Sequence, residues 1–135
     1  MVLKNSSSRK QTGNIGEKIA TDYLKKRGYK ILERNFIFRI PGNPQKSEID
    51  IIAKLKDLIS FVEVKTIKPK KSGSAIPPEE KVNLSKQRKL QQAAEAWLIK
   101  NKIPLNSKWQ IDILTIKIEK GKKEISHFKN AVCGF

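Results

Sequence analysis

One stretch determines the fold of this chain: SEIDIIAKLKDLISFVEVKT, residues 47–66. Its apolar residues recur with a period of two, which predicts two short strands joined as a hairpin at residues 54–57. Strict alternation places Ile49 and Ile51 on one face of the first strand and Asp50 on the other. Acidic residues therefore stand where an ordinary core strand carries Val or Ile.

The charged residues of this hairpin are expected on a single face. In the second strand Glu63 and Lys65 alternate with Val62 and Val64, so strand pairing brings the two charged residues next to Asp50. Burying two carboxylates and an ammonium group beside apolar side chains costs on the order of several kcal/mol unless the charges are paired or bound to a cation. We therefore predict a functional site here, with a buried ion pair of Lys65 as the structural alternative.

The composition indicates one compact domain with a polyanionic partner. The chain has 135 residues, enough for one hydrophobic core, and 38% of them are hydrophobic. Lys and Arg number 29 against 13 Asp and Glu, which gives a formal charge of +16. This excess points to nucleic acid first and to an anionic membrane surface second. Residues 1–12 are polar and basic, so we expect a flexible basic tail before a single domain at residues 13–135.

The sequence also restricts the location and the metal chemistry. No apolar run approaches the roughly 20 residues of a spanning helix, and the N-terminus lacks the apolar block of a signal peptide. A soluble, cytoplasmic protein that is not a membrane protein is therefore expected. Cys133 is the only cysteine and His127 the only histidine, which excludes an internal disulfide and a zinc site within one chain. Any metal is expected to be a hard ion bound by oxygen.

The other elements follow from hydrophobic periodicity. One apolar stripe at helical spacing predicts a first helix that ends at Gly28, and another predicts a long helix that buries Trp97. The resulting order is α-β-β-β-α-β-β, an α/β fold whose central mixed sheet of about five strands is flanked by helices, one on each face. The expected elements are a helix at 13–27, a strand at 29–38 with an irregular middle at Arg34-Asn35, the hairpin at 47–66, a helix at 84–101 capped by Ser85, and strands at 109–119 and 124–129.

An acid in the first helix has an ordinary explanation. Glu17 falls in the first turn or two of the predicted helix, on a face adjacent to the stripe of Ile15 and Ile19. Negative charge is favoured near the positive end of the helix dipole, and the sequence alone favours that interpretation over a functional one.

Polar and basic residues at two places are expected to contact nucleic acid. The loop at residues 68–81 leaves directly from the second strand of the hairpin, within reach of the acids, although a solvated linker is its structural alternative. The start of the long helix combines polar donors with the positive end of the helix dipole, which suits a phosphate. The residues concerned are Lys68, Lys70, Lys71, Lys86, Gln87 and Arg88.

The acid face has the ligands of a magnesium site. Asp50 and Glu63 supply two carboxylates on neighbouring strands, and the carbonyl of Val64 can complete the coordination. Mg²⁺, with Mn²⁺ as a substitute, prefers such ligands and keeps several waters for a phosphate substrate. Lys65 can orient or deprotonate the attacking water and stabilise charge in the transition state. Glu48, on the Asp50 side of its strand, is a further candidate catalytic acid.

These residues also carry a resemblance to a known family. Asp50 with Glu63-Val64-Lys65 resembles the PD-(D/E)-x-K nuclease signature, here without its proline. The chain after Gly13 is similar to the YraN-like family of bacterial endonucleases. The similar segments are Gly16-Glu17, Ala20, Tyr23-Leu24, Gly28-Tyr29, residues 47–50, residues 61–65, residues 86–89, Trp97-Leu98, Asp112 and residues 127–131.

The resemblance extends to archaeal Holliday-junction resolvases and implies a restriction-endonuclease-like core with metal-dependent nuclease activity. By position it makes Glu17 the helix-borne acid near the metals, Asp50 and Glu63 the metal ligands, and Lys65 the catalytic lysine.

Three classes of function fit the sequence. The preferred one is a Mg²⁺-dependent endonuclease that hydrolyses DNA, with branched or structured DNA in repair or recombination as the expected substrate. The second is a non-catalytic nucleic-acid-binding protein on the same fold. The third is an RNA-associated or ribosome-associated basic protein, for which the charge of +16 is equally suitable. The sequence leaves open whether the protein forms a homodimer.

Overall fold

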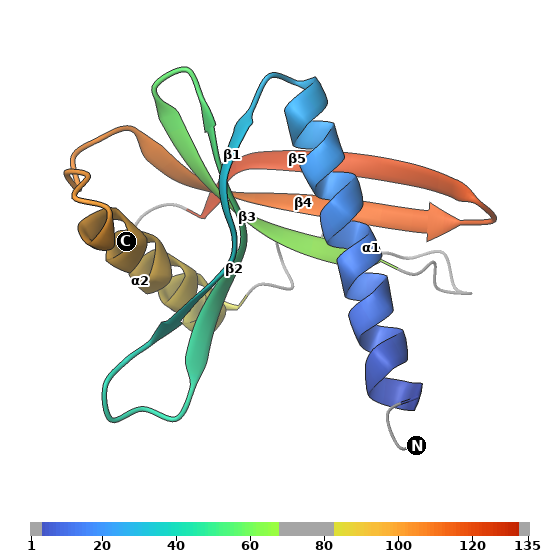
Figure 1. Ribbon diagram of the computed structural model, residues 1–135, viewed down its shortest axis with the longest axis horizontal. Coiled ribbons are helices and arrows are strands. Elements are labelled where there is room, and N and C mark those ends of the chain that lie inside the picture. Colours follow the sequence, from blue (N-terminus) through green and yellow to red (C-terminus); the bar gives the residue numbers. More distant parts are fainter. Residues whose placement is uncertain (1–3, 68–82, 133–135) are drawn as a thin grey trace.

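The computed structural model describes residues 4–67 and 83–132, with side chains from residue 14 onward. Five strands form one sheet in the order β1-β2-β3-β4-β5, and one helix covers each face (Figure 1). The predicted α/β fold and the order α-β-β-β-α-β-β are therefore confirmed. The elements are α1 (Lys4–Lys26), β1 (Lys30–Arg39), β2 (Lys46–Leu55), β3 (Leu58–Ile67), α2 (Leu84–Lys100), β4 (Trp109–Glu119) and β5 (Lys122–Val132).

The connections explain why the sheet is mixed. β1, β2 and β3 form an antiparallel meander, and the tight turn between β2 and β3 places Lys56 at a φ of 55°. α2 then carries the chain over one face of the sheet, so β4 returns parallel to β3, as such a crossover requires. β4 and β5 are antiparallel around a turn at Lys120 and Gly121, both with positive φ. Within the described residues, no helix is long and apolar enough to cross a membrane.

Each face of the sheet has its own hydrophobic core. The α1-face core joins α1 to the sheet, and the α2-face core joins α2 to the opposite face. Trp97 belongs to the α2-face core and is 4% exposed, so the prediction that it is buried is confirmed. Buried residues of the α1-face core are Ala20, Leu24, Tyr29, Ile51, Ala53, Val62, Leu114 and Ile116. Those of the α2-face core include Phe36, Ile49, Ile52, Phe61, Leu90, Leu98, Ile111 and Ile113.

One prediction about the hairpin is wrong. Ile49 and Ile51 were expected on the same face, but Ile49 belongs to the α2-face core and Ile51 to the α1-face core. Alternation is therefore interrupted at Asp50. The register places Asn35 opposite Asp50, and Asn35 has a φ of 55°, so the irregular middle predicted for β1 is present. A residue in the left-handed region disturbs the pleat of both paired strands, which period-two counting cannot anticipate.

Three boundaries also differ from the expected ones. α1 begins at Lys4 and not at residue 13, so it includes most of the segment that was expected to be a tail. Once a helix is nucleated, each further residue adds a hydrogen bond, so polar residues can extend it without an apolar face. Asn83, and not Ser85, caps α2, since its side chain accepts a hydrogen bond from the amide of Lys86. β5 runs over residues 122–132, longer than the predicted 124–129, because it pairs with most of β4.

The sheet forks between β2 and β3, and this fork positions the candidate site. The two strands are paired from the turn as far as Ile51 and Val62. Beyond that pair β2 continues beside β1 as far as Lys46, whereas β3 continues beside β4 as far as Ile67. Figure 1 shows the two strands running apart. Asp50 and Glu63 are the first residues past the last pair, so their side chains enter the space that opens.

A glycine allows α1 to lie directly on β3. A Cβ atom at Gly16 would collide with Oγ1 of Thr66 and would lie 3.9 Å from Cγ1 of Val64. Any larger residue at this position would hold the helix away from the strand. Because Glu17 follows immediately, the close approach also brings its carboxylate toward the fork.

We expect Gly16→Ala to destabilise the protein by about 1–3 kcal/mol, because the steric conflict with Thr66 outweighs the higher helix propensity of Ala. Urea denaturation measures the change. The control is Lys18→Ala at an exposed position of the same helix, expected within about 0.5 kcal/mol of wild type. Adding Thr66→Ala to Gly16→Ala should recover part of the loss, and additive losses in the double variant would contradict the proposed contact.

Candidate functional site

At the fork the side chain of Asp50 on β2 replaces the backbone acceptor that β3 would otherwise have. Its Oδ2 accepts a hydrogen bond of 2.8 Å from the amide of Val64 on β3. The two strands are no longer paired here, so the carboxylate satisfies an amide that β2 no longer reaches with its own backbone. This contact fixes the Asp50 carboxylate beside β3. Val64 thus acts through its amide, and metal binding by its carbonyl stays a prediction.

Glu63 is the buried acid of the fork. Its residue is 7% exposed, and the charge of the neighbouring Asp50 carboxylate acts on its carboxyl group. Two ammonium groups lie further away: Lys65 Nζ is 3.9 Å from Oε1, and Lys86 Nζ is 3.7 Å from Oε2. Both distances fit ion pairs but are too long for hydrogen bonds. The structure therefore brings Asp50, Glu63 and Lys65 together, as the hairpin predicted.

The two carboxyl groups cannot both ionise easily. Burial, followed by the charge of Asp50, raises the pKa of Glu63 from 4.5 to about 7, although Lys86 and Lys65 oppose the shift. Burial also raises the pKa of Asp50, and the hydrogen bond from Val64 partly offsets that rise. Like charges this close disfavour double ionisation, so the pair holds a shared proton up to nearly neutral pH. A bound cation would remove this repulsion.

Glu17 approaches the same pair from α1. Since α1 begins at Lys4, Glu17 lies in the middle of the helix, and the interpretation of an acid favoured by the N-terminal dipole is wrong. Burial and then the Asp50 charge raise the pKa of Glu17, and Arg34 opposes that rise. Its Oε1 is buried and has no hydrogen-bond partner in the part of the chain that the structure describes. The helix therefore supplies a third carboxylate whose charge acts on the fork.

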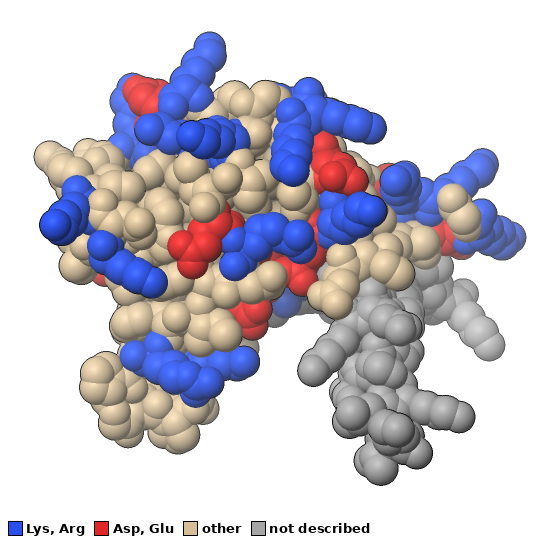
Figure 2. Space-filling view, in the orientation of Figure 1, with Lys and Arg blue, Asp and Glu red and all other residues tan. Residues whose placement is uncertain are grey.

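Glu48 is the fourth acid of this group. It is half-buried, and its negative charge contributes to the raised pKa values of both Asp50 and Glu17. Figure 2 shows acidic side chains near the middle of one face, with lysine and arginine side chains around them. A polyanion drawn to the basic surface would therefore meet negative charge at its centre.

The donor set fits a hard divalent cation such as Mg²⁺. Within the described residues, Oε1 of Glu17 and Oε2 of Glu63 are buried carboxylate oxygens without hydrogen-bond partners, which is the condition that a metal ligand satisfies. No group of three Asp, Glu, His or Cys side chains in the described part of the chain lies close enough to hold a metal alone. Two carboxylates still suffice for Mg²⁺, because it keeps several waters and takes further oxygens from a phosphate substrate.

The basic residues expected to bind nucleic acid are only partly described. Lys86 lies in the first turn of α2 and faces Glu63, while Arg88 is exposed and Gln87 is half-buried nearby. Lys89, in the next turn of α2, donates a hydrogen bond of 2.6 Å to Oε1 of Gln45. The start of α2 is thus tied to both the fork and the loop before β2. Lys68, Lys70 and Lys71 lie outside the described residues.

A second buried acid has a structural role. Asp112 on β4 is 0% exposed, yet both of its oxygens are satisfied. Oδ1 accepts hydrogen bonds of 2.9 Å from Gln110 Nε2 and from the amide of Asn130, and Oδ2 lies 2.8 Å from Nε2 of His127. These contacts close the irregular pairing of β4 with β5. Asp112 and the acids of the fork give the same signal in the sequence, an acid within an apolar strand. Only the hydrogen-bond donors around each acid distinguish a structural acid from a member of the candidate site.

The fold and the site define an α/β protein whose mixed five-stranded sheet carries a group of carboxylates where two strands separate. The chain belongs to the uncharacterised protein family UPF0102, whose family model matches residues 16–116. This is the YraN-like family indicated by the sequence, so that resemblance is confirmed. The matched segment includes Glu17, Asp50, Glu63 and Lys65.

Relatives of similar length share about two fifths of their residues with this chain. The UPF0102 protein of Alkaliphilus oremlandii is 39% identical over 124 residues, which cover 90% of this chain and 97% of the relative. That of Acetivibrio thermocellus is 39% identical over 132 residues, or 94% of this chain and 95% of the relative. A UPF0102 protein of Clostridium tetani is 45% identical over 98 residues, 73% of each chain. The names of these relatives state no activity.

The raised pKa of Glu63 predicts that the metal-free protein loses stability as pH rises. The folded state holds a proton that the unfolded state releases above about pH 4.5, so stability falls by up to roughly 3 kcal/mol as the pH passes from 4.5 to 7. Glu63→Gln should lack this loss and be more stable than wild type at pH 8. Urea denaturation of both proteins at pH 5 and pH 8 measures it. An identical pH dependence of the two proteins would contradict the shared proton.

Replacing Asp112 should have the opposite effect to Glu63→Gln: it should lower the stability of the protein. Asp112→Leu should destabilise the protein by about 3 kcal/mol at neutral pH, because Nε2 of Gln110 and the amide of Asn130 lose their acceptor and His127 loses its partner. The control is Glu124→Gln on exposed β5, expected within about 0.5 kcal/mol. Thermal or urea unfolding measures the stability of the Asp112 variant and of the control. An Asp112→Leu variant as stable as wild type would show that this acid is not structural.

Proposed function

We propose that this protein is a metal-dependent endonuclease that hydrolyses DNA phosphodiester bonds, with branched or structured DNA in repair or recombination as its substrate. The observation that carries the proposal is the pair of half-buried Asp50 and buried Glu63, whose charges repel one another beside the amine of Lys65. A fold tolerates such a pair at a cost in stability, and perturbed carboxylates of this kind cluster at functional sites.

Mg²⁺ at this site would be held by Asp50 and Glu63, with Glu17 near enough to act on it electrostatically. When bound, it supplies positive charge for the transferred phosphate and lowers the pKa of coordinated water. The carboxylates must lose their shared proton to bind it, so affinity for the ion should rise with pH through about 7, the value to which the Glu63 pKa is raised. An enzyme that depends on this ion would therefore work at neutral to alkaline pH.

Lys65 is the group best placed to assist the attacking water. Its side chain is 37% exposed, so its amine meets solvent on one side and Glu63 on the other, 3.9 Å away. From this position the ammonium group can orient a water molecule and stabilise negative charge that develops on the phosphate oxygens. Glu63 in turn keeps the amine at the fork.

The surrounding charge explains how a polyanion would reach an acidic site. The chain carries a formal charge of +16, and basic side chains surround the acidic centre in Figure 2. The start of α2 adds Lys86 beside the fork, at the positive end of the helix dipole, and Arg88 is exposed in the same helix. Long-range attraction therefore favours DNA, while the carboxylates repel its phosphates until a cation is present.

A nucleic-acid-binding protein without cleavage activity, for DNA, RNA or the ribosome, is the second candidate. The ion pair of Lys86 with Glu63 favours it, because an ammonium group already opposes the charge of this carboxylate. In that case the acids would fix the start of α2 and would not need a metal.

The test is to incubate the purified protein with branched, single-stranded and duplex DNA, each with Mg²⁺, Mn²⁺ or EDTA. Asp50→Asn and Glu63→Gln should abolish metal-dependent cleavage while the variants stay folded, because each removes a charged ligand. Lys65→Ala should lower turnover by about 10²-fold or more, the usual contribution of such a group, with little change in DNA affinity. Glu124→Gln serves as a control with unchanged cleavage.

The outcomes separate the two candidates. Cleavage that needs the metal and both carboxylates supports the endonuclease, and cleavage that persists in EDTA or in Asp50→Asn would indicate a contaminating nuclease. Tight DNA or RNA binding without cleavage under every metal condition would favour the non-catalytic protein, and competition between the two nucleic acids would then identify its ligand.

A further inference from the structure

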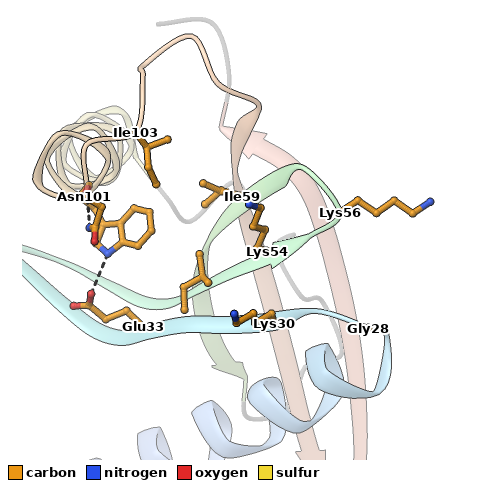
Figure 3. A pocket seen from close by; sticks show the side chains of 10 residues that line it. Gly28, Lys30, Glu33, Lys54, Lys56, Ile59, Asn101 and Ile103 are labelled. Carbon is orange, nitrogen blue, oxygen red and sulfur yellow. Dashed lines mark hydrogen bonds between the residues drawn. The ribbon is translucent and has the colours of Figure 1, made fainter.

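A pocket lies at the opposite end of α2 from the fork. It has a volume of about 700 Å³, within the usual range for small-molecule sites (Figure 3). Lys86, beside the fork, lies in the first turn of α2, and Asn101, which lines the pocket, caps its end. At 1.5 Å per residue, the helix separates these two positions by about 22 Å. The pocket is lined by Gly28, Lys30, Leu32, Glu33, Lys54, Lys56, Ile59, Trp97, Asn101 and Ile103.

Strand register concentrates positive charge on one side of this pocket. Lys30 on β1 and Lys54 on β2 are direct cross-strand partners. Like charges in this arrangement are destabilising unless something neutralises them. In Figure 3 the Lys54 side chain extends toward Ile59, whereas Lys56 extends away from the pocket. The two paired lysines are therefore the cations available to a ligand.

A shift in register places polar and apolar groups side by side. The pairing of β1 with β2 changes between Ile31 and Glu33, so Leu32 and Glu33 both line the pocket. Glu33 keeps its negative charge, but its Oε1 accepts a hydrogen bond of 3.0 Å from Nε1 of Trp97, which holds the carboxylate on the indole side and away from Lys30 and Lys54 (Figure 3). The apolar wall is completed by Ile59 and Ile103.

Other nearby groups leave the pocket positive. Asp57, at the hairpin turn, forms an ion pair of 3.0 Å with Lys108. The negative end of the α2 dipole points this way, but its last carbonyls are occupied: the Asn101 side chain donates to Trp97 O, and the amide of Ile103 donates to Leu98 O. An anion in the pocket would therefore meet ammonium groups and few unpaired acceptors.

We propose that this pocket binds a nucleoside phosphate, with the phosphate between Lys30 and Lys54 and the base against the apolar wall of Leu32, Ile59 and Ile103. The pairing of two cations with an apolar wall fits a ligand that is anionic at one end and flat and apolar at the other. The ligand is either a free nucleotide or an unpaired nucleotide of a strand. The site is separate from the fork and does not depend on cleavage.

The test is a titration of the full-length ¹⁵N-labelled protein with deoxyadenosine monophosphate, followed by NMR. Two signals report on the pocket, the indole N–H of Trp97 and the amide of Gly28, and the amide of Gly121 in the distant β4–β5 turn is the internal reference. We expect saturable shifts of the first two and none of the third. Deoxyadenosine and inorganic phosphate, which each lack half of the ligand, should bind at least about tenfold more weakly.

A matched pair of double variants tests the lysines. Lys30→Ala with Lys54→Ala should weaken binding at least about tenfold, whereas Lys120→Ala with Lys123→Ala removes the same charge at the far turn and should leave it unchanged. Unfolding midpoints of both variants verify the fold, and the single variants Lys30→Gln and Lys54→Gln replace the double variant if it unfolds.

Several results would overturn the proposal: no saturable shift at Trp97, equal weakening by both double variants, or binding of inorganic phosphate as tight as that of the nucleotide. The source of the ligand is resolved by adding a single-stranded oligonucleotide to the bound nucleotide. Displacement of the nucleotide assigns the pocket to a strand, and simultaneous binding assigns it to a free nucleotide. Because each readout is binding, an inactive fork would not affect the result.

Discussion

The hydrogen bond from the amide of Val64 to Asp50 is the contact on which the rest of the site depends. It lies where β2 and β3 stop pairing, so a side chain replaces the backbone partner that the sheet no longer provides. The opening lets Glu63 stand beside Asp50, and it brings the start of α2 and the middle of α1 close to both acids. In a continuous ladder the backbones of β2 and β3 would stay paired, and no opening between the strands would be left for a cation.

Two kinds of buried acid occur in this sheet, and they differ in how their charge is satisfied. Asp112 has three hydrogen-bond contacts, and their removal would leave buried donors unpaired. The charge of Asp50 acts on Glu63, and a carboxylate oxygen of Glu63 has no hydrogen-bond partner among the described residues. The first arrangement stabilises the fold. The pair of Asp50 and Glu63 lowers the stability of the fold at neutral pH. A bound ligand that neutralises the charge of the pair explains its presence better.

Helix α2 connects two regions of different chemistry. Its first turn is capped by Asn83 and presents Lys86 to the carboxylates of the fork. Its last turn contributes Trp97 to a pocket that two cross-strand lysines make positive. The core beneath the helix is continuous, since Trp97 packs edge-on against Phe61 in the same α2-face core. The distance between the two regions is therefore fixed by a rigid element and not by a loop.

The sequence by itself determined the order of elements, the hairpin, the bounds of β4 and the meeting of Asp50 with Glu63, because periodicity and short spacing are local properties. Only the tertiary structure decided the rest. The opposite faces of Ile49 and Ile51 arise from a bend shared by two paired strands. The place of Glu17 depends on how closely Gly16 lets α1 approach Thr66. Whether the oxygens of a buried carboxylate receive hydrogen bonds depends on donors far away in the chain, and no local sequence pattern predicts those donors.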